Sequence, residues 1–466
     1  MPARAKQPAS TAATKAAKGA TKAAPKAAPK VAPKARPTKK TAAPATNGAA
    51  TKKRKAESEE PQDAAEPVEL TAKRIKRDAV APKAKLPAIG KKVNEVPTQI
   101  LDVYVFGEGT SGELGLGSKR VNGKKPIDVK RPRLNDNLAS IGVVQISCGG
   151  MHAACLGRDN KIYTWGVNDQ GALGRDTTWE GGLRDMDGSD SDSEDDDDDT
   201  GINPVESTPT AVDESAFTPG TKCVQVVAGD SATFALTQDG RVYGWGTFRS
   251  NDGILGFNAT VKVQMRPVLV PELKNITKLA AGANHVLALD NKGNVVAWGC
   301  GQQNQLGRRI IERNKMSSLL PQGVGLPRGR IVKIACGAYH SFAIDRDGKA
   351  WGWGLNNFGE IGVPANAGED DAVILKPAKL DWLKDHKIAD IAGGVHHSLA
   401  CCDKGRLFSW GRVDGNQVGL DASTLNKDDL IFDERDTPRI LVKPTPHKGK
   451  ISSLIVMKFD HLLTSI

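Results

Sequence analysis

The sequence is short of several features that mark common classes of protein. Aromatic residues make up only 5% of the 466 residues. No apolar run is long enough to span a membrane, and the first thirty residues contain no apolar segment of the kind found in signal peptides. The seven cysteines form no C-x-x-C pair and lie mostly in apolar runs. This pattern is typical of buried free thiols in a reducing compartment.

Acidic residues are absent from residues 1–55, which carry fifteen lysines and arginines. The formal net charge of the whole chain is +11, but the first ninety residues hold 21 basic and seven acidic residues, so the remainder is mildly acidic. Residues 1–95 also lack a hydrophobic period, and we expect a disordered tail. Such a tail either only keeps the protein soluble or binds DNA and chromatin by charge. We favour chromatin binding, with Lys26, Lys30 and Lys34 among the residues involved.

Two basic clusters in this tail match the pattern of nuclear localisation signals. They consist of Lys52, Lys53, Arg54, Lys55, Lys73, Arg74, Lys76 and Arg77. Clusters of this kind are read by an acidic groove of importin, so the sequence predicts importin as a partner and the nucleus as the location.

From about residue 100 onward the chain is built of repeats. Five full units cover residues 143–174, 223–256, 276–307, 331–362 and 388–419, and a partial unit covers 103–117. Each full unit has an alternating strand that ends near a glycine, a second apolar strand, a turn and a third strand that ends in Trp-Gly. The Trp-Gly pairs recur 53 to 80 residues apart. Short antiparallel strands at this period predict an all-β propeller over residues 96–446.

Two segments depart from the repeat. Residues 185–200 are an acidic insertion with five consecutive aspartates. It is either a solvated loop, a contact for histones, or a segment that folds back on the basic tail. Residues 447–466 contain no Trp-Gly and no Asp-Gly turn, so we expect an atypical end and an incomplete last blade.

The units resemble those of the regulator-of-chromosome-condensation family. The shared pattern is a Gly pair, a histidine, an Asp-Gly turn, a Trp-Gly pair and a G-x-L-G end, and it covers about residues 100–420. The resemblance implies a seven-bladed propeller whose first blade is completed by strands from the C-terminus. With the basic tail, it implies a chromatin-bound guanine-nucleotide exchange factor for the small GTPase Ran. Exchange needs no covalent chemistry, so we expect no cofactor, no metal, no small-molecule substrate and no membrane.

The segment 246–257 resembles the exchange wedge of this family, a short hairpin that projects onto the GTPase. The residues of the predicted wedge are Phe248, Arg249, Ser250, Asn251, Asp252, Gly253, Ile254, Leu255 and Gly256. An ordinary loop between strands is the alternative. We favour the wedge because a simple connection rarely needs the apolar residues Ile254, Leu255 and Phe257 near its tip.

The family's other contact positions for the GTPase fall at or beside turns of the repeat. They map to Thr110, His152, Asp230, Asn284, Arg308, His396 and His397. Thr110 and Asn284 stand where metazoan relatives have acids, so neither supplies a carboxylate, whereas Asp230 keeps its carboxylate. The recurring histidines have a structural alternative, in which each imidazole bonds the neighbouring blade. Ala232 replaces the histidine in its unit.

Three arginines form a basic loop after the unit that ends at residue 307. These are Arg308, Arg309 and Arg313. The family uses a nearby arginine loop to bind the acidic patch of the histone dimer, and a solvated basic loop is the alternative. Two functions therefore stay open: a Ran exchange factor on the nucleosome, and a chromatin-binding propeller scaffold without exchange activity.

Overall fold

The computed structural model describes residues 87–120, 123–124, 126–180, 201–449 and 462–465. Every described residue belongs to one compact unit, Ala81–Ile466. The predicted chromatin-binding lysines of the tail, both nuclear localisation signals and the acidic insertion 185–200 lie outside the described residues.

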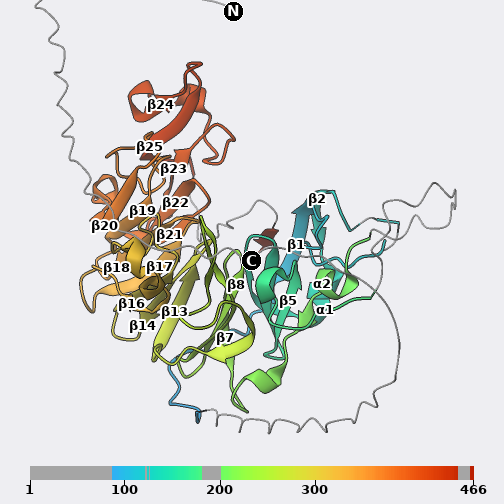
Figure 1. Cartoon of the computed structure of the whole chain (residues 1–466). Coiled ribbons are helices and arrows are strands. Elements are labelled where there is room, and N and C mark those ends of the chain that lie inside the picture. The colour runs from blue at the N-terminus through green and yellow to red at the C-terminus, as the bar shows by residue number, and fades with distance from the viewer. Residues whose placement is uncertain (1–86, 121–122, 125, 181–200, 450–461, 466) are drawn as a thin grey trace, which may run out of the picture. The chain divides into compact units, whose positions relative to one another are not determined.

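The described strands form antiparallel sheets that follow the sequence repeats in order (Figure 1). Sheet 1 contains β1 (Asp102–Gly107), β2 (Val129–Leu134) and β26 (Leu462–Ser465). Sheet 2 contains β3 (Val143–Cys148), β4 (His152–Gly157), β5 (Ile162–Gly166) and β6 (Thr210–Ala211). Sheet 3 contains β7 (Cys223–Ala228), β8 (Ala232–Thr237), β9 (Val242–Gly246) and β12 (Gln264–Leu269).

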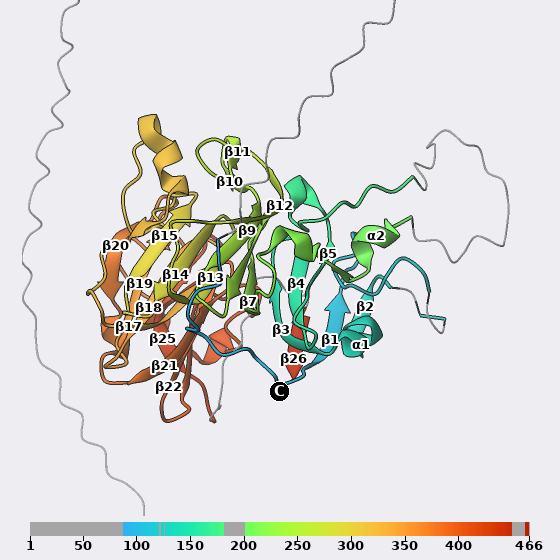
Figure 2. The ribbon, with the colours of Figure 1, turned by 90° about the horizontal axis from the view of Figure 1, so that it is seen from below.

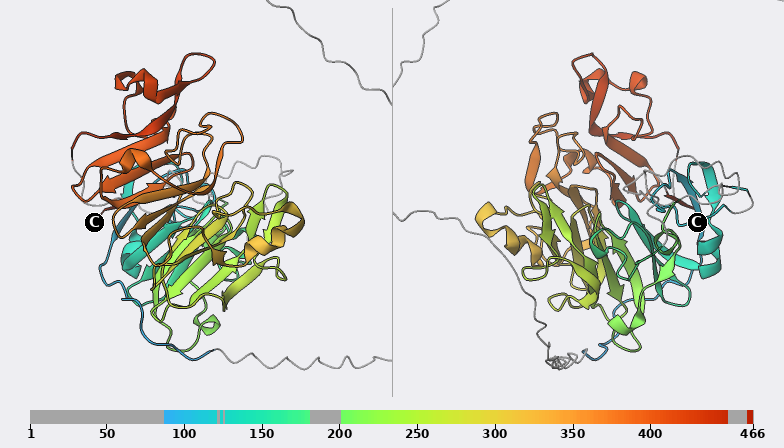
Figure 3. Two further views of the ribbon diagram at one scale, coloured as in Figure 1. Left: turned by 90° about the vertical axis from the view of Figure 1, so that its left-hand side faces the viewer. Right: turned by 45° about the vertical axis from the view of Figure 1, so that its right-hand side comes forward.

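The remaining sheets continue the same up-and-down order. Sheet 4 contains β13 (Ile276–Ala281), β14 (His285–Asp290), β15 (Val295–Gly299) and β16 (Gln322–Gly323). Sheet 5 contains β17 (Ile331–Cys336), β18 (His340–Asp345), β19 (Ala350–Leu355) and β20 (Val373–Lys379). Sheet 6 contains β21 (Ile388–Gly393), β22 (His397–Cys402), β23 (Leu407–Arg412), β24 (Leu430–Phe432) and β25 (Pro438–Pro446). Strands β24 and β25, red in Figure 3, extend sheet 6 outward.

Short helices and one hairpin lie in the connections. The hairpin consists of β10 (Phe248–Ser250) and β11 (Gly253–Gly256). The α-helices are α1 (Asp136–Ile141) and α2 (Pro204–Ser207). The 3₁₀ segments are η1 (Asp169–Gly171), η2 (Glu214–Ala216), η3 (Glu312–Leu319), η4 (Asp381–Leu383), η5 (Ala422–Thr424) and η6 (Lys427–Asp429).

Consecutive sheets pack against each other through apolar cores. The tryptophan of the Trp-Gly pair that ends the third strand of each full unit lies in such a core and is at most 2% exposed: Trp165, Trp245, Trp298, Trp353 and Trp410. The glycine that follows is required by the backbone. Gly246, for example, has a φ of +90°, and a side chain there would collide with the carbonyl oxygen of Ser231. The repeated Trp-Gly pair thus fills the core and lets the chain turn directly after it.

Both ends of the described region join the sheets. Strand β26 pairs antiparallel with β1, as the family resemblance implied for the C-terminal strands. Before β1, the backbone NH of Gly90 donates to Asp239 at 2.7 Å, and the amide of Asn94 donates to carbonyls of sheets 3 and 4. From the sequence we assigned these two residues to the tail. The described residues confirm the all-β class and contain six repeat sheets, whereas the number of blades in a closed propeller stays a prediction.

Candidate functional site: a hairpin and its surrounding turns

A line of turns crosses one edge of sheets 2 to 6, where the first strand of each sheet turns into the second. Successive turns are joined by backbone hydrogen bonds: Gly150 N to Gly229 O, Asp230 N to Ala283 O, Ala283 N to Ala338 O, and Ala338 N to Gly394 O, at 2.7 to 3.3 Å. Because these bonds use the main chain, they fix the spacing of the turns whatever the side chains are. Side chains from neighbouring turns can therefore act together.

The turn after each Trp-Gly pair lies at the same edge. In sheets 2 to 6 the residue that follows this pair donates its NH to the carbonyl just before the second strand, at 2.6 to 3.0 Å. The accepting residues are Met151, Ser231, Asn284, Tyr339 and His396. Each sheet thus brings two turns to this edge, and a surface built from both is held by a repeated main-chain bond.

Where a histidine directly follows one of these accepting residues, it has a structural role. His285 is fully buried, and its Nε2 lies 2.8 Å from the hydroxyl of Ser341 in the next sheet. That hydroxyl donates its single hydrogen to the carbonyl of Gln305, which also accepts the indole NH of Trp353 at 2.9 Å. Nε2 must therefore carry the proton and donate to Ser341. His340 makes the same relay with Ser398.

The predicted contact residue His152 belongs to this buried series. It is 3% exposed and bonds Thr233 of sheet 3 at 2.8 Å. Burial lowers its pKa to about 4, so it is neutral at physiological pH. The structure places it beneath the face that the turns form, and not on it. His397, also predicted, is half-buried with its ring against Gly394.

The break in the histidine series has a structural reason. Ala232 replaces the histidine in sheet 3, and Val286 stands in sheet 4 where the hydroxyl residue would be. Both are buried in a core that also contains Phe248, the first residue of the hairpin. The ring of Phe248 lies 5.8 Å from that of Phe234, and the same Phe234 ring meets Trp298 edge-on at 5.5 Å. The polar relay is thus replaced by an apolar core that anchors the hairpin.

The hairpin projects at the edge where these turns lie, next to η3 (Figure 2). Its apolar residues divide between two environments. Leu255 and Phe257 are each 6% exposed and pack in the core, whereas Ile254 is 37% exposed. From the sequence we placed all three near the tip, but two of them are anchors. The exposed surface of the hairpin consists of Ile254 with the polar residues Arg249, Asn251 and Asp252.

Polar contacts hold the root of the hairpin to three sheets. The NH of Arg249 donates to the side-chain oxygen of Asn284 at 2.8 Å, and the amide NH2 of Asn284 donates to Asp230 at 3.1 Å. The guanidinium of Arg249 pairs with Asp169 at 2.8 Å. The structure therefore brings the predicted residues Asp230 and Asn284 together with the predicted hairpin. It also explains why an amide serves at 284, since a second carboxylate there would face that of Asp230.

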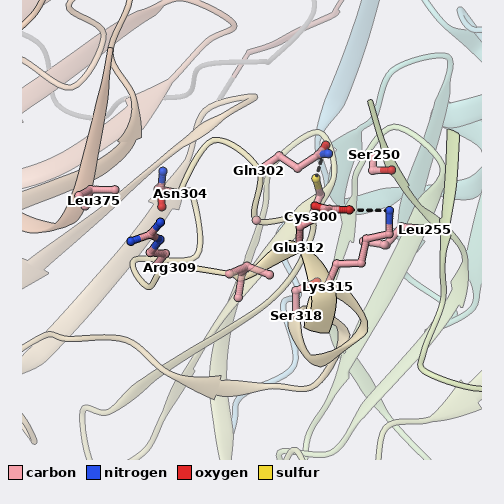
Figure 4. A pocket seen from close by; sticks show the side chains of 12 residues that line it. Ser250, Leu255, Cys300, Gln302, Asn304, Arg309, Glu312, Lys315, Ser318 and Leu375 are labelled. Carbon is pink, nitrogen blue, oxygen red and sulfur yellow. Dashed lines mark hydrogen bonds and ion pairs between the residues drawn. The ribbon is translucent and has the colours of Figure 1, made fainter. Parts of the chain in front are cut away.

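The outer side of the hairpin borders a pocket of about 470 Å³ (Figure 4). The hairpin, η3, β20 and the connection between β15 and η3 line it. The lining residues include Ser250, Leu255, Cys300, Ile310, Lys315 and Leu375. Lys315 bridges Asp252 at 3.0 Å and Glu312 at 2.8 Å, which raises the pKa of its amine. Burial raises the pKa of the Cys300 thiol, so this cysteine is not a reactive thiolate.

The three predicted arginines of the basic loop have different surroundings. Arg308 points inward, donates to the carbonyl of Ala297 at 3.0 Å, and has its pKa lowered to about 10 by burial. Arg309 and Arg313 are exposed, and Arg309 lines the pocket beside the hairpin. The basic loop therefore lies next to the predicted wedge.

Two other predicted contact residues, Thr110 and His396, lie beside the first and the last of the six sheets. Thr110 is exposed in the turn that follows β1, and its hydroxyl bonds Glu108 of the same turn at 3.5 Å. His396 of sheet 6 lies 3.5 Å from the buried carboxylate of Glu360, with its ring 4.5 Å from that of Phe358.

Two residues of the face were missed from the sequence. Met151 is 51% exposed, and Tyr339 occupies the same turn position in sheet 5. Burial and the nearby charge of Asp230 raise the pKa of Tyr339. Their position in the repeat could have revealed them. They come directly before the repeated histidine, and because successive side chains alternate, they point away from the core when the histidine points into it.

The described residues contain no group of three or more histidine, cysteine or acidic side chains that could hold a metal ion. Within the same residues, no helix has the length and hydrophobicity needed to cross a bilayer. Fold and site together define an all-β repeat protein in which a hairpin is held among turns that share the same main-chain bonds. Such a surface suits a macromolecular partner.

Comparison with known proteins agrees with that class. The RCC1-like domain family matches residues 102–462. The chain is 37% identical to Protein pim1 of Schizosaccharomyces pombe, over 84% of this chain and 69% of that protein. It is 44% identical to Guanine nucleotide exchange factor SRM1 of Saccharomyces cerevisiae, over 70% and 68% of the two chains. The chain therefore belongs to the family of the regulator of chromosome condensation.

A solved structure supports the same assignment. Prp20p of Saccharomyces cerevisiae is 38% identical, superposes with a TM-score of 0.67, and is matched over 77% of both chains. That structure was described together with the binding properties of Prp20p to Gsp1p and histones.

Proposed function

We propose that this chain is a guanine-nucleotide exchange factor for Ran, and that the β10–β11 hairpin is the wedge that promotes GDP release. The observation that carries the proposal is that some side chains of the hairpin are buried anchors and others are exposed. Phe248 and Leu255 are buried anchors, while Arg249, Asp252 and Ile254 are exposed. A relative named as an exchange factor, and the binding of Prp20p to Gsp1p, support the choice of partner.

The mechanism is differential binding. A hairpin that is pinned at its root loses little conformational freedom when it meets a partner. If it fits nucleotide-free Ran better than the GDP complex, its binding weakens GDP binding by the same factor, and GTP then displaces the exchange factor. No covalent bond forms or breaks, so the chain is not an enzyme in that sense and needs no cofactor.

The turns beside the hairpin supply the rest of the contact face. We assign to it Thr110, Met151, Asp230, Asn284, Tyr339 and His396. We place His152, His397 and Arg308 beneath this face. His152 is buried, the ring of His397 lies against Gly394, and Arg308 points inward to the carbonyl of Ala297.

Chromatin binding and nuclear import belong to the same proposal. The lysines of the tail bind DNA, Arg309 and Arg313 bind histones, and the two basic clusters bind importin. The basic tail precedes Gly90, which bonds sheet 3, and the repeats form a seven-bladed propeller. Since Arg309 lies beside the hairpin, histone binding there competes with Ran binding.

A chromatin-binding scaffold without exchange activity is the second candidate. The exposed side chains of Arg309 and Arg313 favour it, because they would serve chromatin whether or not the hairpin acts on a GTPase.

Release of fluorescent GDP from Ran–Mg²⁺ tests the proposal. We expect the chain to accelerate release, and a variant with residues 250–254 replaced by Gly and Ser to lose the acceleration. This variant keeps the anchors Phe248 and Leu255, so its thermal unfolding midpoint should match that of the parent chain. Acceleration that survives in a folded variant would contradict the wedge. No acceleration by the folded parent chain would favour the scaffold.

A further inference from the structure

The carboxylate of Asp169 links three parts of the structure. Asp169 lies in η1, in the turn that follows β5 of sheet 2. Its Oδ2 accepts from the guanidinium of Arg249 in the hairpin at 2.8 Å, and from the hydroxyl of Ser231 in sheet 3 at 2.9 Å. One oxygen atom thus ties the hairpin to two neighbouring sheets.

The turn that carries Asp169 is itself rigid. Asn168 accepts from the NH of Leu173 at 3.0 Å, and its NH2 donates to the carbonyl of Arg175 at 3.2 Å and to the hydroxyl of Thr177 at 2.9 Å. Together with the bond from Ser231, these contacts fix the position of the Asp169 carboxylate. The ion pair with Arg249 therefore differs from an ordinary surface pair, in which both side chains move.

Arg249 needs such a partner to hold one orientation. Its main chain is fixed by the bond to Asn284, but its long side chain is 47% exposed. Exposed ion pairs add little to stability, so the value of this pair lies in orientation. The planar guanidinium keeps further NH groups for a partner when one of them is bound to a carboxylate.

We propose that Asp169 is a positioning residue for exchange, which acts by orienting the Arg249 guanidinium on the hairpin toward the GTPase. The inference rests on the proposed function of the hairpin. It assigns a role to a residue of sheet 2 that lies outside the predicted wedge, and it makes the hairpin dependent on the neighbouring repeat.

A double-mutant cycle separates positioning from a merely structural role. GDP release from Ran is measured with Asp169→Ala, Arg249→Ala and the double variant. If Asp169 acts through Arg249, each single variant loses on the order of tenfold in release rate, and the double variant is no slower than Arg249→Ala. Asp169→Asn should lie between the parent chain and Asp169→Ala, because it keeps an acceptor oxygen without the charge.

An ion pair at the other edge of the sheets, away from the hairpin, provides a matched control. Asp347 in the β18–β19 turn pairs with Arg330 at 2.5 Å, and both side chains are about half exposed (55% and 47%). Asp347→Ala removes an exposed Asp–Arg pair away from the hairpin, and should leave the release rate within about twofold of the parent chain.

NMR of the Arg249 side chain gives a readout that does not depend on GDP release. The Nε–H of Arg249 should exchange with water faster in Asp169→Ala than in the parent chain and in Asp347→Ala, at an unchanged unfolding midpoint. If the parent chain fails to release GDP, the proposed function fails, and this side-chain signal still decides whether Asp169 orients the guanidinium. Losses that multiply in the double variant, or an unchanged Arg249 signal in Asp169→Ala, would overturn the inference.

Discussion

Replacing Phe248 by alanine should separate the anchor of the hairpin from its exposed surface. The Phe248 side chain is 1% exposed, stacks on Phe234 and lies against Gly299, where even a methyl group would be too close. A Phe→Ala change at such a core position costs about 3 to 5 kcal/mol of unfolding free energy. Ile254→Ala changes the same hairpin at a side chain that is 37% exposed, and should cost about 0.5 kcal/mol or less.

Urea denaturation of the two variants beside the parent chain measures both effects. The slope of the free energy against urea should stay constant, so that the shift in midpoint reports stability alone. The reasoning is refuted if Phe248→Ala costs less than about 1 kcal/mol, or if the two variants cost the same. Either result would mean that the hairpin is not anchored in the core between sheets 3 and 4.

Three further outcomes follow from the same geometry. Ser341→Ala should lower the unfolding free energy by about 1 to 3 kcal/mol in urea, because it leaves the buried NH of His285 without its acceptor; no loss would contradict the relay. The folded-state pKa of His152 is about 4, below the 6.5 of the unfolded chain, so stability is complete above pH 6.5 and should fall by about 3 kcal/mol as the pH drops to 4. His152→Gln, which does not titrate, should show a shallower dependence in the same denaturation series. Asn284→Asp should raise the pKa of one carboxyl of the pair that it forms with Asp230, measured by NMR titration, whereas two ordinary titrations would show that the side chains are apart.

The repeat made much of the fold predictable. Trp-Gly pairs and glycine turns have local causes, namely core filling and a positive φ, and they recur in every full unit. The apolar alternation around them predicted antiparallel strands, which is what the structure contains. The pairing of β26 with β1 was implied only by the family resemblance, because no local pattern marks strands so far apart in sequence.

The face was harder to predict, because burial there depends on the neighbouring sheet. The repeated histidine drew attention to His152, but its hydroxyl partner lies 81 residues later, in sheet 3. The residue one position earlier varies from methionine to asparagine to histidine, and only the turn geometry gathers these side chains on one surface. In the hairpin, the burial of Leu255 and Phe257 depends on the core between sheets 3 and 4, which no local pattern reveals.

The measurement that tests the central claim most directly compares two exposed β-branched residues. Ile254 lies on the hairpin, and Val332 lies on β17 of sheet 5 and is 46% exposed. Stopped-flow release of GDP from Ran–Mg²⁺ is recorded with the parent chain, Ile254→Ser and Val332→Ser. The account predicts a loss on the order of tenfold for Ile254→Ser and a rate close to that of the parent chain for Val332→Ser. Equal rates for the two variants would contradict the claim that the hairpin acts on the GTPase.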